Sequence, residues 1–178
     1  TRSRKKGSSM RSVLLVAAMV LCACPKKETA PAPAPPPPPV VDDCTLETAL
    51  VPGIPGSPGH LIASERNPNG ASELANHMRL MVDDVRDAKA KVLAGQPVPA
   101  LWQKHRKLRC AWPTAASDRN AAFDAMAQHY LAKVRELDAK PADMKAAFTG
   151  VVGACRSCHE ATCDGPIAVI DGLTLDAK

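Results

Sequence analysis

The sequence predicts an all-α protein, specifically an up-down-up-down four-helix bundle. Beyond residue 70, apolar side chains recur every three or four positions in four separate segments, which is the period of an amphipathic helix. No stretch alternates with period two for long enough to indicate a sheet. The connections are mostly short, so consecutive helices should run antiparallel.

The first two predicted helices lie between Gly70 and Arg109. The first ends at Gly95, and its apolar stripe consists of Leu74, Met78, Met81, Val85, Ala88 and Val92. The second is predicted over about Val98 to Arg109, with Pro97 and Pro99 at its start.

The third and fourth predicted helices follow Ser117 and Pro141. Ser117 is a plausible N-cap for the third, whose stripe is Phe123, Met126, Tyr130, Val134 and Leu137. The stripe of the fourth is Met144, Phe148, Val151, Val152 and Cys155. In an up-down bundle the start of the first helix and the end of the fourth lie at the same end.

The fourth helix leads into Cys155-Arg156-Ser157-Cys158-His159, the pattern C-x-x-C-H. Two thiols at this spacing can form thioethers with the two vinyl groups of haem, and the adjacent imidazole then becomes the proximal ligand of the iron. A redox-active dithiol and half of a zinc site are the alternatives. The first needs a βαβ setting and the second needs another ligand pair, and neither pattern is visible. We therefore expect one covalently bound haem c.

The segment 145–161, KAAFTGVVGACRSCHEA, resembles the last helix of the class II cytochromes c, the cytochrome c-prime family. A phenylalanine seven residues before the first haem cysteine is typical of that family. The resemblance implies a left-handed four-helix bundle with haem at one end, thioethers at Cys155 and Cys158, and His159 as proximal ligand. It places the distal residue at Met78, with Met81, about one turn further on, as second choice. The chain departs from the family after the motif, where Thr162-Cys163-Asp164 replaces a basic pair and the extension Gly165–Leu173 follows.

The distal residue decides which function this resemblance implies. Ligation by a methionine thioether would give His/Met coordination, which raises the potential and favours electron transfer with redox partner proteins. An open position would instead favour a five-coordinate haem protein that binds or senses NO or CO. Neither paired carboxylates nor a nucleophile with its base is evident, so the chain is not expected to be an enzyme. A haem-based, peroxide-reducing activity is the alternative left open. A homodimer is left open.

Other residues near the motif have both a structural and a functional interpretation. His77, His105 and His129 are alternative distal ligands, with His77 preferred among them. His105 stands among Lys104, Arg106 and Lys107, which indicates a solvated face. Arg79 and Arg156 are either surface charges or partners of the haem propionates.

Three further cysteines, Cys44, Cys110 and Cys163, should lie at the haem end of the bundle. An export compartment permits disulfides, so we expect one bridge among them. Its pairing does not follow from the sequence, and Cys163 is the favoured participant because it would fasten the C-terminal extension.

The N-terminal third predicts export and a membrane anchor. Residues 1–23 have a basic start and a short apolar run, Val13–Leu21, like a signal peptide. Leu21-Cys22-Ala23-Cys24 resembles the bacterial lipobox, with Cys24 as the lipidated residue and Cys22 a weaker choice; an ordinary cleaved signal peptide is the alternative. Residues 24–41 form a Pro/Ala-rich tether, residues 42–69 an irregular lead-in, and residues 70–178 the haem domain. A periplasmic lipoprotein is expected, and Lys26 favours the outer membrane.

The net charge of +5 belongs to the signal segment, which carries five Lys and Arg and no acidic residue. The remaining chain has 18 basic and 18 acidic side chains. A basic surface for nucleic acid or anionic lipid is therefore not expected, and the lipid provides the membrane contact.

Overall fold

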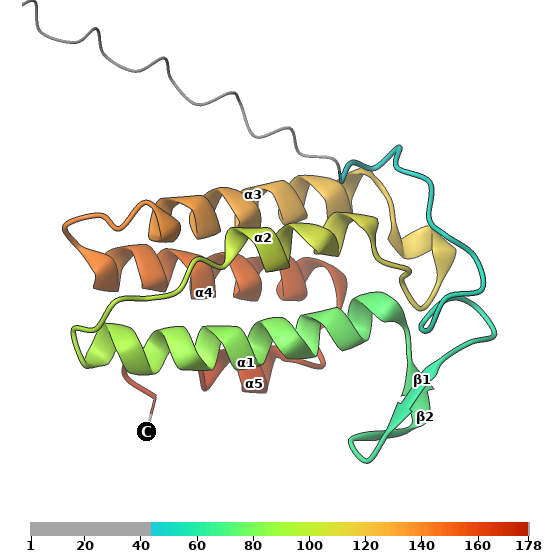
Figure 1. Cartoon of the computed structure of the whole chain (residues 1–178), viewed down its shortest axis with the longest axis horizontal. Coiled ribbons are helices and arrows are strands. Elements are labelled where there is room, and N and C mark those ends of the chain that lie inside the picture. Colours follow the sequence, from blue (N-terminus) through green and yellow to red (C-terminus); the bar gives the residue numbers. More distant parts are fainter. Residues whose placement is uncertain (1–43, 178) are drawn as a thin grey trace, which may run out of the picture. The chain divides into compact units, whose positions relative to one another are not determined.

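The computed structural model describes residues 44–177, and these are predominantly helical (Figure 1). The predicted signal segment, the lipidation site at Cys24 and the tether 24–41 lie outside the described residues. The elements in chain order are β1 (Ile62–Ser64), β2 (Asn67–Ala71), α1 (Glu73–Leu93), α2 (Trp102–His105), the 3-10 helices η1 (Arg106–Cys110) and η2 (Ala116–Asp118), α3 (Ala121–Asp138), α4 (Met144–Thr162) and α5 (Ile167–Asp171). The prediction of a helical fold class is confirmed.

Three long helices carry most of the core. α4 packs against both α1 and α3, while α2 packs against α3. The chain reverses direction between α1, the α2–η1 segment, α3 and α4 in turn (Figure 1). Phe148, Val151 and Val134 are completely buried where the apolar stripes of α3 and α4 meet. The start of α1 and the end of α4 consequently lie at the same end of the helical layer (Figure 1).

Side-chain caps fix where the long helices begin. Ser72 accepts a hydrogen bond from the backbone N–H of Ala75 at the start of α1, and Asp143 does the same for Ala146 in α4. The cap of α3 is Asn120, not Ser117 as predicted, because Ser117 lies within η2. The predicted boundary of α1 is close to the observed one.

The second predicted helix is much shorter than expected. Instead of one helix over Val98 to Arg109, the chain forms the four-residue α2 followed by the 3-10 helix η1. The Asp138 carboxylate at the end of α3 accepts hydrogen bonds from the backbone N–H groups of Leu101 and Trp102, at 3.0 and 2.8 Å. These hydrogen bonds from the end of α3 cap the N-terminus of α2, so α2 begins later in the chain than the two prolines predicted.

The lead-in before α1 is more ordered than the sequence indicated. β1 and β2 form an antiparallel hairpin. Gly56 has φ +91°, and its backbone lies so close to Glu73 that a Cβ would approach the Glu73 nitrogen to 2.2 Å. The Gly56 carbonyl accepts a hydrogen bond from the Glu73 N–H at 3.1 Å. The lead-in therefore packs tightly on the first turn of α1.

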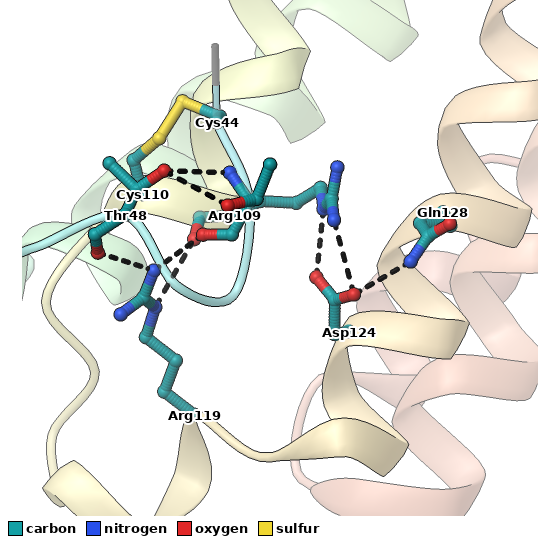
Figure 2. Close-up of polar contacts among 8 residues, drawn as sticks. Cys44, Thr48, Arg109, Cys110, Arg119, Asp124 and Gln128 are labelled. Carbon is teal, nitrogen blue, oxygen red and sulfur yellow. Dashed lines mark hydrogen bonds and ion pairs between the residues drawn. A yellow bond between two sulfur atoms is a disulfide. The ribbon is translucent and has the colours of Figure 1, made fainter. Parts of the chain in front are cut away.

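A disulfide and two arginines fasten the start of the lead-in to the helices (Figure 2). Cys44 is bonded to Cys110 at the end of η1, so the expectation that Cys163 takes part in the bridge is wrong. Arg109 forms a buried ion pair with Asp124 of α3, with Nε–Oδ1 at 2.8 Å and Nη2–Oδ2 at 3.1 Å. Arg119 donates to the carbonyl oxygens of Thr45 and Thr48 at 2.6 and 2.8 Å.

Candidate functional site

The residues of the C-x-x-C-H motif lie on one face of α4. Cys158 and His159 come three and four positions after Cys155, so they lie on the same face of the helix as Cys155. The apolar stripe that precedes them, including Phe148 and Val152, is buried in the core and orients this face inward.

This face forms part of the wall of a cavity of about 1060 Å³. α1, α3 and α4 contribute residues to the wall, among them Met78, Met81, Tyr130, Cys155, Cys158 and His159. Most of the buried wall is apolar, and the volume is at the upper end of the range for cofactor sites. The structure thus brings together the proposed thioether, proximal and distal residues from helices far apart in the sequence.

The two motif cysteines are unpaired thiols. Burial, then the neighbouring Cys158 thiol, raises the pKa of Cys155 to about 12, while burial raises the pKa of Cys158. Both side chains are therefore neutral at physiological pH. Dithiol exchange requires a thiolate, so this environment does not favour the redox alternative.

The imidazole of His159 is held in one tautomer by the end of its own helix. Its Nδ1 lies 3.0 Å from the carbonyl oxygen of Cys163. A carbonyl can only accept, so Nδ1 carries a hydrogen, and in the neutral imidazole the lone pair is then on Nε2. A hydrogen bond from the second ring nitrogen to a carbonyl is the usual support of a metal-ligating histidine.

Met78 and Met81 both line the cavity, on the part of its wall that α1 supplies. Met81 is 8% exposed and belongs to the core, whereas Met78 is half-buried and packs against it. Arg79 also lines the cavity, and its buried Nη1 has no hydrogen-bond partner within residues 44–177. An anionic group at the cavity edge, such as a carboxylate of a bound cofactor, would satisfy that donor.

The C-terminal extension supplies a further wall that the sequence did not indicate. Ile170 of α5 and Leu173 beyond it are buried and line the cavity. Arg156 of the motif binds Asp171 of α5, with Nε–Oδ1 at 2.8 Å, and also pairs with Glu160. The sequence left Arg156 as either a surface charge or a partner of the haem propionates, and the structure shows it in surface ion pairs. Lys89 of α1 fastens the following segment by donating to the carbonyls of Gly172 and Ala177.

The alternative histidine ligands are dispersed. His77 is half-buried on α1, and His129 is exposed on α3. His105 is completely buried, so the prediction of a solvated face is wrong. Its Nδ1 lies 2.7 Å from the hydroxyl oxygen of Tyr130, in the cavity wall. The flanking basic residues concealed this contact because His105 is turned inward while Lys104 and Lys107 stay exposed.

Within residues 44–177 no cluster of three or more His, Cys, Asp or Glu side chains could hold a bare metal ion. No helix in the same part of the chain is both long and apolar enough to cross a bilayer. Comparison with models of known protein families, with curated proteins and with solved structures finds no match.

Proposed function

We propose that the chain is a membrane-tethered, mono-haem c-type cytochrome of the cytochrome c-prime type that transfers electrons in the periplasm. The observation that carries this proposal is the position of Cys155, Cys158 and His159 on one helix face, walling a large, mostly apolar cavity. Bound haem would supply a one-electron iron couple.

The residues present fit that cofactor. Two neutral thiols at the correct spacing would anchor it, and the His159 Nε2 lone pair is free to bind iron because Nδ1 is hydrogen-bonded to Cys163. The unpartnered Arg79 Nη1 would donate a hydrogen bond to a propionate. The apolar wall would exclude water, which tunes the potential of a buried redox centre.

The finer architecture in this proposal is an up-down four-helix bundle with haem at one end. The alternating directions of α1, α2–η1, α3 and α4 support it (Figure 1). In this bundle the second helix is reduced to α2 and η1, and α5 covers one side of the cavity.

Met78 is the proposed distal ligand, with Met81 as second choice. Both line the cavity from α1, which packs against the helix that carries the motif. If neither binds iron, the open position would support the alternative function, binding or sensing of NO or CO.

Location follows from the N-terminal segment. We propose removal of residues 1–23, lipidation of Cys24 and a spacer through residue 41, which would hold the cytochrome at the periplasmic side of a membrane, with the outer membrane favoured by Lys26. Redox partner proteins would then meet a tethered carrier.

Intact mass measurement after expression with a haem-maturation system tests the proposal. We expect one covalent haem per chain, loss of stable attachment when both Cys155 and Cys158 are replaced by Ser, and full attachment in Cys163→Ser, the matched exposed control. A wild-type chain without covalent haem would overturn the proposal.

The distal ligand is tested by the ferrous spectrum with and without CO. We expect a low-spin, CO-insensitive spectrum that becomes high-spin and CO-binding in Met78→Ala but not in Met81→Ala. A wild type that binds CO at once would favour the gas-binding function, and an unchanged Met78→Ala spectrum would exclude Met78.

A further inference from the structure

A buried chain of polar side chains connects the cavity wall to solvent. Tyr130 of α3 is 4% exposed, and its hydroxyl lies 2.7 Å from Nδ1 of His105, which is completely buried. The two rings stack with centroids 5.9 Å apart and an interplanar angle of 18°. Asp84 of α1 stands at the other edge of the imidazole, with Oδ2 3.5 Å from Nε2, and it reaches the surface, where it pairs with Lys104.

The chemistry of these groups fixes the direction of the hydrogen bond. Nε2 makes no hydrogen bond among residues 44–177 but faces the acidic oxygen of Asp84, so the ring hydrogen is favoured there. Nδ1 then has a lone pair and must accept from the Tyr130 O–H. The phenol thus has a fixed proton acceptor on one side and the cavity, with the Cys155 thiol as neighbour, on the other.

We propose that Tyr130 is a redox-active tyrosine that gives one electron to strong one-electron oxidants reaching the cavity. As the electron leaves, the phenol O–H bond breaks and its proton moves to His105 Nδ1, giving a neutral tyrosyl radical and an imidazolium. The oxidant gains the electron, so charge and atoms balance. This function goes beyond electron carriage by a haem and does not require it.

The surroundings favour this step over simple ionisation. Burial, then the Cys155 thiol, raises the pKa of Tyr130 well above 10.0, so the phenol stays protonated until it is oxidised. An oxidised phenol is a very strong acid, and even a weak base accepts its proton. Burial lowers the pKa of His105 to about 4, so this base is neutral and available at physiological pH.

The imidazolium formed would be stabilised by acidic neighbours. Burial and His77 disfavour its charge, whereas Asp84 of α1 and Asp138 of α3 both favour it. A consequence would be protection of the cavity. Methionine thioethers and thiols are oxidised to sulfoxide and sulfenic acid by strong oxidants, and Met78, Met81 and the motif cysteines line the same space.

The sequence makes the radical easy to assign because Tyr130 is the single tyrosine of the chain. The test oxidises the full chain with a flash-generated ruthenium(III) polypyridine complex and follows radicals by transient absorption and electron paramagnetic resonance. We expect a tyrosyl signal in the wild type and none in Tyr130→Phe. His105→Gln should slow its formation about tenfold through loss of the proton acceptor, whereas His129→Gln, a surface control, should leave the rate unchanged.

Two results would overturn the proposal: absence of a tyrosyl signal in the folded wild type, or equal rates in wild type and folded His105→Gln. If His105→Gln does not fold, the wild type alone decides, because proton transfer coupled to oxidation must be slower in D₂O than in H₂O, and equal rates would also refute the step. The oxidant is external, so the test works on the chain with or without haem, and failure of haem attachment is recognised separately by mass.

Discussion

Acidification from about pH 7 to about pH 4 should destabilise the fold through His105. The pKa of this buried imidazole falls from 6.5 to about 4 because burial disfavours its charged form. At 1.36 kcal/mol for each pKa unit, a gap of about 2.5 gives about 3 kcal/mol. The unfolded chain takes up the proton below pH 6.5 and the folded chain only near pH 4, so stability is fully present above 6.5 and is lost as the pH falls toward 4.

Two other groups, the half-buried His77 and the buried Asp124, also affect how stability depends on pH. Burial also lowers the pKa of His77, so acidification destabilises the fold through His77 as well. The Arg109 guanidinium lowers the pKa of Asp124 from 3.8, so the stability that Asp124 contributes is present above pH 3.8 and is lost only below it. The window between about pH 4 and 6.5 therefore reports mainly on the histidines.

Urea unfolding followed by circular dichroism across this window measures the effect. His105→Gln should be less stable than the wild type near neutral pH, and its stability should fall by about 3 kcal/mol less on acidification. His129→Gln, which removes a surface imidazole, should keep the wild-type slope. If His105→Gln and the wild type lose stability in parallel, then His105 is not a buried neutral imidazole that accepts from Tyr130 in the folded protein.

Three substitutions test the remaining contacts. Asp124→Asn should cost about 3 kcal/mol or more in thermal unfolding, because it removes a carboxylate that pairs with a buried guanidinium. Glu136→Gln, which removes the carboxylate of an exposed pair, should cost about 0.5 kcal/mol or less, and equal costs would refute the burial argument. Gly56→Ala should destabilise more than Gly59→Ala, since both have positive φ but only the first would clash; equal melting temperatures would exclude the close approach. Asp171→Asn should speed amide hydrogen exchange in α5 without changing exchange in α3. Unchanged exchange in α5 would show that the ion pair between Asp171 and Arg156 does not hold α5 against α4.

Local patterns predicted the long helices well. The stripe of α1 predicts its buried face because Met81, Val85 and Ala88 recur at helical spacing and pack inward. The motif on α4 likewise predicts the juxtaposition of its own three residues, since helical geometry alone sets it. Both predictions depend only on residues that are close together in the sequence.

The features that the sequence did not indicate depend on contacts between distant segments. α2 begins late because the Asp138 carboxylate caps it from the end of α3. Cys44 and Cys110 pair because the lead-in returns to η1, 66 positions away. His105 is surrounded in sequence by basic residues, and only the packing of α2 on α3 reveals that it is buried.

An experimental structure of the haem-loaded chain tests the central proposal most directly. We expect the porphyrin in the cavity between α1 and α4, thioethers at Cys155 and Cys158, and iron bound by Nε2 of His159 while Nδ1 still donates to the Cys163 carbonyl. A porphyrin held elsewhere, or an iron that His159 does not bind, would contradict the proposed cytochrome.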